Sequence, residues 1–208
     1  MLVLPKRLNL QLSLLQQQRV VLLAIPYGFS ILNPHLAQGN KDFEASRITY
    51  EPLASFDKDG KLVAFLAAEI PSLENGGVAK DGKSVTWKLK QGVKWSDGKP
   101  FTAADVVFTY QFVSNPSVGA TTAVNYQAIK NVEAIDDYTV KINFQNPNPA
   151  WSLPFIGSNG PILPRHIFEK YNGSVYRELW LLTSKKFQLR SIFVRRATLL
   201  LIYLDLNH

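Results

Sequence analysis

Residues 84–113 carry the pattern that most constrains how this chain can fold. Ser84 to Lys90 alternates apolar and polar side chains, which is typical of a half-buried strand. Val93 and Trp95 continue the alternation after Gly92, which predicts a second strand. We expect the tryptophans of both strands, Trp87 among them, to lie in the core rather than to serve as a ligand platform.

A helix is predicted directly after these strands. Asp97-Gly98 is a strong turn signal, because both residues tolerate a positive φ. Thr102 and Asp105 then form a variant of the capping box, with Asp in the place of the usual Glu. Apolar residues recur at helical spacing as far as Val113, and Asn115-Pro116 ends the helix.

The rest of the middle of the chain also mixes short strands and helices. Asp59-Gly60 and Asp81-Gly82 are two further turn signals. Residues 129–135 and 138–144 both alternate in polarity and predict a hairpin closed by two aspartates, and residues 165–171 predict a short helix. Short strands interspersed with helices predict the α+β (mixed α/β) class for residues 45–170.

The composition excludes several kinds of chemistry. None of the 208 residues is cysteine, so disulfides, thiolate nucleophiles and Cys-ligated metals are excluded. The histidines, His35, His166 and His208, are too scattered for a zinc motif, and neither a nucleophile elbow nor a phosphate-binding loop is present. We therefore predict no catalytic residue, no metal site and no cofactor.

The positive charge is confined to the two ends of the chain. The net charge is +7, yet residues 31–174 are balanced, and the excess comes from residues 1–30 and 175–208. These basic ends leave open an alternative function, a small protein whose tails bind nucleic acid or an anionic membrane. The apolar run Val20 to Ile25 is too short to span a bilayer, and a signal peptide is not evident.

Ordered segments of the middle region resemble the extracytoplasmic solute-binding proteins of family 5, the peptide, oligopeptide and nickel receptors of ABC importers. The most specific segment is WKLKQGVKWSDGKPFTAADVVF at residues 87–108. The other matching segments, in the family's order, are residues 31–36, 50–53, 57–62, 66–69 and 162–166. The long motif coincides with the predicted turn and helix cap, so we interpret it as structural and assign it no ligand contact.

The resemblance implies a periplasmic-binding-protein-like class II fold with two lobes. We expect this chain to supply only the first part of lobe one and the inserted small domain. Residues 1–30 would include the first strand of lobe one after a start outside the family, and residues 31–174 would be the family region. Residues 175–208 form an atypical basic and aliphatic tail that we expect to lie outside the family, so the chain is expected to be a truncated form.

The resemblance also implies where a ligand would bind. In the family the ligand lies between the lobes, which places Asn33 and His35, in the loop after the first strand, near the cleft. Tyr50 and Glu51 would lie near it as well, where an aromatic ring packs on a ligand side chain and a carboxylate pairs with a ligand amine. An interdomain packing role for Tyr50 and a surface role for Glu51 are equally compatible with the sequence.

The function implied by the resemblance is the capture of a solute for import. The full-length protein would bind a peptide or a related small molecule outside the cytoplasmic membrane, in the periplasm or at the extracellular face. It would deliver this solute to the permease subunits of an ABC transporter. We expect a monomer that is not an enzyme and does not bind nucleic acid.

Overall fold

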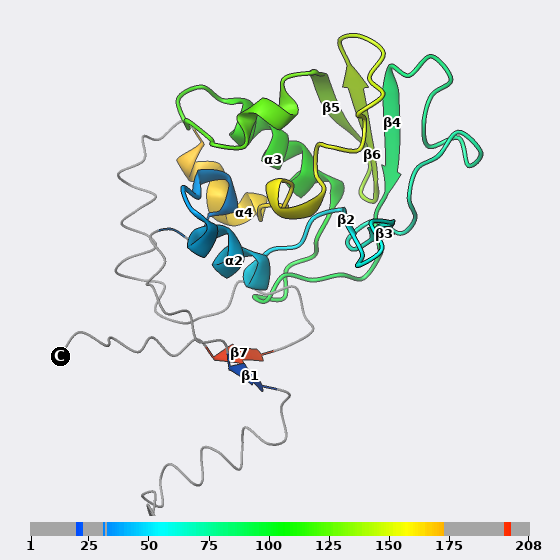
Figure 1. Cartoon of the computed structure of the whole chain (residues 1–208). Helices are drawn as coiled ribbons and strands as arrows, with labels where there is room; N and C mark the ends of the chain where they lie inside the picture. Colours follow the sequence, from blue (N-terminus) through cyan, green and yellow to red (C-terminus); the bar gives the residue numbers. More distant parts are fainter. Residues whose placement is uncertain (1–19, 23–30, 32, 173–197, 201–208) are drawn as a thin grey trace, which may run out of the picture.

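A computed structural model describes residues 20–22, 31, 33–172 and 198–200 of the chain (Figure 1). Its elements, with η for a 3₁₀ helix, are β1 (Val20–Leu22), η1 (Pro34–Leu36), α2 (Asn40–Thr49), β2 (Ala54–Phe56), β3 (Leu62–Ala64), β4 (Ser84–Lys88), α3 (Ala103–Ser114), η2 (Ala123–Tyr126), β5 (Ile129–Asp136), β6 (Thr139–Phe144), η3 (Gly157–Asn159), α4 (Arg165–Phe168), η4 (Glu169–Tyr171) and β7 (Thr198–Leu200). The mixed α and β content that the sequence predicts is confirmed.

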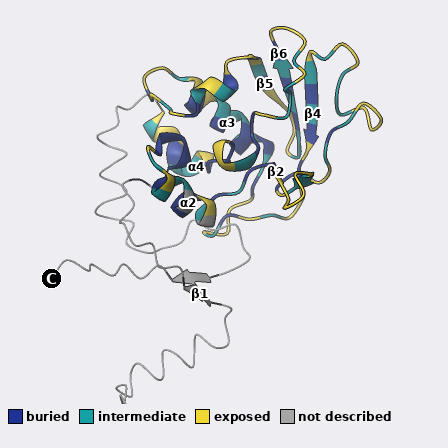
Figure 2. Cartoon of the chain, in the orientation of Figure 1, coloured by how far each residue is buried: buried dark blue, intermediate teal, exposed yellow. Residues whose placement is uncertain are grey.

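An antiparallel sheet in the order β4-β6-β5 forms one side of the body. On the central strand, Val140, Ile142 and Phe144 are buried and alternate with partly exposed polar residues, as a strand with one covered face requires. The helix α3 packs against β5 and β6, and α2 and α4 lie on the same side of the sheet as α3 (Figure 1). Buried residues are frequent in α3, β4 and β6, while Figure 2 shows that the turns at the outer end of the sheet are exposed.

The predicted turns and the predicted hairpin are confirmed. Gly60, Gly82 and Gly98 all have a positive φ, between 66° and 89°, which the preceding turns require. β5 and β6 pair as an antiparallel hairpin, and Tyr138 N donates to Asp136 Oδ1 at 2.7 Å to close the turn between them. The local signals of alternation and turn chemistry were sufficient for this part of the fold.

The second predicted strand, Val93 to Trp95, is wrong. Gly92 has a φ of 72° and turns the chain away from the sheet. The segment then folds back on itself, because Trp95 N donates to Lys99 O at 2.8 Å and Phe101 N donates to Val93 O at 3.0 Å. The result is a narrow local loop with a single isolated β-bridge, although Trp95 itself is buried as predicted.

The helix predicted after this loop is confirmed as α3, and its cap has a second function. The Asp105 Oδ2 atom accepts from Thr102 N at 3.0 Å, which is one arm of the expected capping box. The same oxygen accepts from Trp95 Nε1 at 3.2 Å, and Oδ1 accepts from Arg165 N at 2.8 Å. One carboxylate therefore joins the loop before α3, the start of α3 and the start of α4.

Burial dominates the ionisation of this carboxylate. Asp105 is only 4% exposed, and desolvation raises its pKa above the usual range even though its three hydrogen bonds act in the opposite direction.

The helix predicted at residues 165–171 is confirmed as α4 followed by η4. At its start, Arg165 N donates to Asp105 Oδ1.

The helix α2 was not predicted from the sequence. Its inward positions include Asp42, Ala45 and Ser46, and two of these are polar, so the hydrophobic periodicity of a buried helix face is weak. Tyr50 caps its C-terminus through a hydrogen bond from its N–H to Ser46 O at 2.9 Å.

The described residues outside the body form one more pair of strands. β1 pairs in parallel with β7, with Val20 opposite Thr198. The other predictions for residues 1–30 and 175–208 lie outside the residues that the structure describes. Within the described part of the chain, no helix combines the length and the apolar character needed to cross a bilayer.

The Asp105 contacts predict a large loss of stability in Asp105→Ala. The substitution leaves three backbone or indole N–H donors without their acceptor, and we expect the free energy of unfolding to fall by roughly 3 kcal/mol or more. Urea denaturation measures this change. The control is Asp59→Ala, whose carboxylate is 70% exposed and, among the described residues, pairs with Lys58 alone; we expect a loss below about 0.5 kcal/mol. Equal, small losses in both variants would contradict the conclusion that Asp105 holds these three segments together.

Candidate functional site

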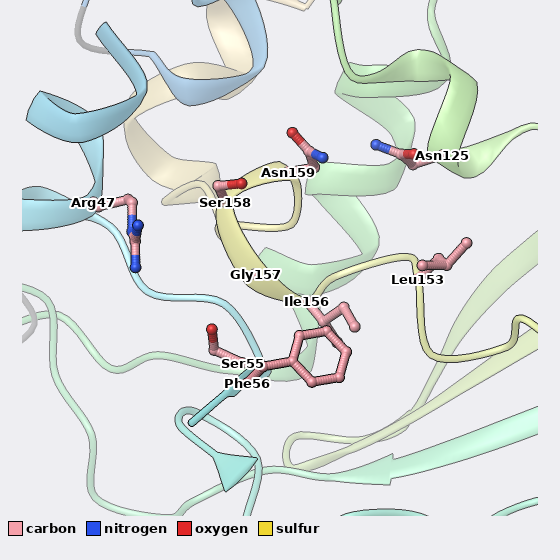
Figure 3. Close-up of a pocket in the computed structure, with 9 residues that line it drawn as sticks. All are labelled: Arg47, Ser55, Phe56, Asn125, Leu153, Ile156, Gly157, Ser158 and Asn159. Carbon is pink, nitrogen blue, oxygen red and sulfur yellow. The ribbon is translucent and has the colours of Figure 1, made fainter. Parts of the chain in front are cut away.

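A pocket of about 320 Å³ opens where α2, β2, η2 and the loop around η3 meet (Figure 3). The lining comes from residues 47–56 and from residues 125–159, which are distant in sequence, so the pocket exists only in the folded chain. The described residues that line it are Arg47, Ser55, Phe56, Asn125, Leu153, Ile156, Gly157, Ser158 and Asn159.

The walls of the pocket differ in chemistry. Figure 3 shows Arg47 extending from α2 on one side, while the amides of Asn125 and Asn159 point toward one another on another side. Phe56 and Ile156 lie together and form an apolar wall. A concave site with apolar walls and a few polar groups is the usual form of a small-molecule site.

The loop that carries η3 has a constrained backbone next to the pocket. Phe155 is fully buried and has a φ of 64°, a left-handed conformation that is rare for a bulky residue. Two contacts hold it there: its carbonyl accepts from Leu53 N at 2.9 Å, and its ring packs edge-on against Tyr126 at 5.1 Å between centroids. Strained residues of this kind are concentrated at functional sites, because the surrounding structure must stabilise them.

Gly160 completes the loop by a close backbone approach. A Cβ atom at this position would overlap the backbone nitrogen of Ile156 and the carbonyl carbon of Phe155. Only glycine fits here, and this fixes the path of the η3 loop along the pocket.

The chain after the loop is tied to the connection between α2 and β2 and to two positions of α3. Ile162 N donates to Glu51 O at 3.0 Å, and Leu163 N donates to the buried Thr109 Oγ1 of α3 at 2.9 Å. Arg165 N donates to Asp105, as described above. Residues 155–165, which we call the pocket segment, are therefore anchored at both ends, and the pocket is preformed.

His35, a predicted ligand residue, is fully buried in the structure. Its Nδ1 lies 2.7 Å from Thr122 Oγ1 and its Nε2 lies 2.8 Å from Pro161 O. A carbonyl can only accept, so Nε2 carries the proton and Nδ1 accepts from the threonine hydroxyl. Burial lowers the pKa of His35 to about 4, although the hydrogen bond to Pro161 raises it. The neutral ring thus fastens the pocket segment to η1, and direct ligand contact stays a prediction.

The other three predicted residues also lie outside the pocket lining. Asn33 is buried; its Oδ1 accepts from His35 N at 3.0 Å, and its Nδ2 has no hydrogen-bond partner among the described residues. Tyr50 is buried against Phe168, with 6.5 Å between ring centroids, and burial raises its pKa. Glu51 is half-buried, and its carbonyl anchors the pocket segment. The structure therefore places all four behind or beside the pocket rather than on its surface.

The residues that do line the pocket were not predicted. Arg47, Phe56 and Asn125 belong to no sequence motif. The one local signal that could have pointed to the pocket is the composition of residues 157–160, which is typical of a turn. Among the described residues, no group of three or more His, Asp or Glu side chains is arranged to hold a metal ion.

We predict that Gly160→Ala disrupts the pocket segment. The added methyl group must displace the backbone of residues 155 and 156, and we expect a loss of about 2 kcal/mol or more in the free energy of unfolding. Gly39→Ala is the control, because a Cβ atom there meets nothing within 4 Å; at this helix N-cap we expect a loss of about 0.5 kcal/mol. Equal stabilities of the two variants, measured by urea denaturation, would refute the close approach.

The buried His35 predicts a loss of stability in mild acid. The unfolded chain binds a proton on this residue near pH 6.5, whereas the folded chain binds one only near pH 4. Between these values the unfolded state carries more protons, so the free energy of unfolding falls as the pH falls, by roughly 3 kcal/mol from pH 7 to pH 4.

His35→Gln removes this contribution, and its unfolding free energy should fall less steeply over the same range. His166→Gln, at a more exposed position beside Asp97, should keep the steep fall of the wild type. Parallel pH profiles for the wild type and His35→Gln, measured by urea denaturation at each pH, would show that His35 is not the titrating group.

Comparisons with known proteins agree with this architecture. Residues 61–183 match the family model described as "Bacterial extracellular solute-binding proteins, family 5 Middle". The glutathione-binding protein GsiB of Pectobacterium atrosepticum is 33% identical over 129 residues, which are 62% of this chain and 24% of that protein. The oligopeptide-binding protein OppA of Bacillus subtilis is 29% identical over 133 residues, 57% of this chain and 23% of that protein.

Solved structures show the same likeness. OppA of Listeria monocytogenes bound to peptide has a TM-score of 0.63 and 25% identity, covering 74% of this chain and 32% of that one. NikZ of Campylobacter jejuni in complex with Ni(L-His) has a TM-score of 0.61 and 26% identity, covering 75% of this chain and 29% of that one. The likeness thus spans about a quarter of the curated relatives and a third of the solved structures, as expected for one part of a class II solute-binding fold. The chain belongs to family 5 of the bacterial extracellular solute-binding proteins.

Proposed function

We propose that this chain forms part of the solute-binding surface of an ABC importer receptor, and that the pocket beside η3 contacts the solute. The observation that carries the proposal is the preformed pocket, which combines apolar and polar walls on a body of family 5. The relatives named above bind glutathione, oligopeptides or a nickel–histidine complex, so the solute of this chain would be a peptide or a related small molecule.

The anchoring of the pocket segment favours a binding role. A site whose walls are already in place loses less conformational entropy when a ligand binds than a site that must first become ordered. Phe155 and Gly160 fix one end of the segment, and the hydrogen bonds of Leu163 and Arg165 fix the other. The pocket can therefore contribute affinity without a folding cost.

The four residues predicted from the resemblance would act mainly by positioning. His35 and Glu51 hold the pocket segment through Pro161 and Ile162. Asn33 has a buried Nδ2 that lacks a partner among the described residues, and it remains a candidate for a direct contact with solute.

The wider role follows from family membership. In this proposal, residues 31–174 are the family region, and the protein acts outside the cytoplasmic membrane as a monomer without catalytic activity. It captures the solute and delivers it to the permease subunits of an ABC transporter. Transfer to the permease would require the two-lobed arrangement to close around the solute.

A solute titration tests this proposal. We expect a tripeptide, glutathione or a nickel–histidine complex to shift the backbone NMR signals of ¹⁵N-labelled chain at residues 156–159 and at Ser55, Phe56 and Asn125. Binding with a dissociation constant in roughly the millimolar range is sufficient, since a partly enclosed pocket buries only part of a ligand.

A matched pair of variants makes the titration specific. Phe56 and Ile135 are exposed to a similar extent, 55% and 58%, but only Phe56 lines the pocket. Phe56→Ala should weaken binding by about five-fold or more, whereas Ile135→Ala should leave it unchanged. Signals that do not shift with any solute, or that shift only outside the pocket, would contradict the proposal.

A further inference from the structure

We propose that an extended segment of a peptide solute pairs with the free edge of β2, through the backbone N–H and C=O groups of Phe56. This inference rests on the proposed function, because it names how the same pocket would hold a peptide. It is carried by the hydrogen-bond pattern of β2 and by the point at which the neighbouring chain turns away from this strand.

The hydrogen bonds at the two ends of β2 determine which of its backbone groups face β3. Asp57 N donates to Lys61 O at 2.9 Å, and Phe65 N donates to Leu53 O at 2.9 Å. In an antiparallel pair, residues that bond to the partner strand alternate with residues whose N–H and C=O groups point away from it. Phe56 directly precedes Asp57 in this alternation, so its N–H and C=O groups point away from β3.

On the far side of β2 from β3, the neighbouring chain pairs with one position only. Ala54 forms an isolated parallel bridge with Ile156. The next residue, Gly157, has a φ of 60° and begins η3, so the chain does not continue as a strand alongside Phe56. In the part of the chain that the structure describes, no residue forms a hydrogen bond with the backbone N–H or C=O of Phe56. An unpaired donor and acceptor on a strand edge can pair with another extended chain.

This free edge of β2 lies at the pocket. Phe56 and all three residues of η3 line the same cavity of about 320 Å³. Figure 3 shows the side-chain amides of Asn125 and Asn159 across the cavity from Phe56. A side-chain amide offers one acceptor and two donors, which complements the donor and the acceptor of a peptide group. A peptide backbone between them would therefore meet hydrogen-bonding groups on two sides.

The apolar side chains at the pocket fit the same mode of binding. Phe56 and Leu153 are 55% and 52% exposed, and both line the pocket. Side chains of neighbouring strands that lie on the same face of a sheet contact one another, so a solute side chain beside the Phe56 ring would pack against it. Backbone pairing supplies the affinity in this mode, and the apolar contact adds a preference for an aliphatic or aromatic side chain.

Hydrogen exchange at one amide tests the pairing directly. In the free 208-residue chain we expect the Phe56 amide to exchange almost as fast as in an unstructured peptide. The Asp57 amide, which donates to Lys61 O, should exchange about ten-fold more slowly or less. The probe is trialanine with an N-acetyl and an N-methylamide cap, which has no charged end. Bound probe should slow exchange at Phe56 by about ten-fold or more and change the rate at Asp57 far less.

A modified probe tests the donor that the peptide supplies. The same capped trialanine with methyl groups on all three alanine nitrogens cannot donate these N–H groups to Phe56 O. We expect its dissociation constant, measured from the NMR signals of residues 156–159, to be at least about five-fold higher than that of the unmethylated probe.

Two variants at one position test the donor that the protein supplies. Phe56→Pro and Phe56→Ala both lack the aromatic ring, but only the proline variant lacks the N–H group. Proline is tolerated here because the Phe56 N–H does not bond to β3. We expect Phe56→Pro to bind the unmethylated probe at least about five-fold more weakly than Phe56→Ala does. An unchanged fingerprint spectrum away from residue 56 confirms that each variant is folded; if the proline variant does not fold, the methylated probe decides.

Three results would overturn the inference: bound probe that leaves exchange at Phe56 unchanged, equal affinity for the methylated and unmethylated probes, or equal affinity of the folded proline and alanine variants. If one of these occurs while a peptide still shifts the signals of the pocket residues, this inference fails and the proposed function stands. If neither the capped trialanine nor any other solute shifts these signals, both fail.

Discussion

The described body depends on one buried carboxylate. Asp105 receives hydrogen bonds from Trp95, Thr102 and Arg165, which belong to three different segments, and its burial makes each of these contacts costly to lose. The most specific family motif in the sequence therefore supplies the carboxylate that connects these three segments. Arg165 is the last residue of the pocket segment, so its hydrogen bond to Asp105 also helps to fix the wall of the pocket.

Local signals were enough to predict the elements that follow simple periodicity or turn chemistry. The hairpin of residues 129–144 and the capped helix α3 are confirmed for this reason. The prediction of a strand at Val93 to Trp95 was wrong because Gly92 bends the chain away from the sheet. The alternating residues there bury Trp95 but do not pair with a strand of the sheet. The helix α2 was missed because Asp42 and Ser46 occupy buried positions that periodicity expects to be apolar.

The lining of the proposed solute pocket was much harder to predict than the fold. Arg47 and Phe56 lie on the consecutive elements α2 and β2, but Asn125 comes from η2, and only tertiary packing brings it to the same pocket. The resemblance pointed to His35 and Glu51, which the structure places in the support of the pocket segment rather than in its lining. Solute contacts on one fold can differ from one receptor to another, because function depends on the site rather than on the fold.

The most direct test of this account is native-state hydrogen exchange at the amides of Leu163 and Arg165. These amides donate to Thr109 and Asp105, so the account predicts that they exchange only through global unfolding, with the same free energy of opening as the amides of β6. Exchange that is much faster than in β6, with a small free energy of local opening, would contradict it. The pocket segment would then be a mobile loop, and the pocket beside it would not be preformed.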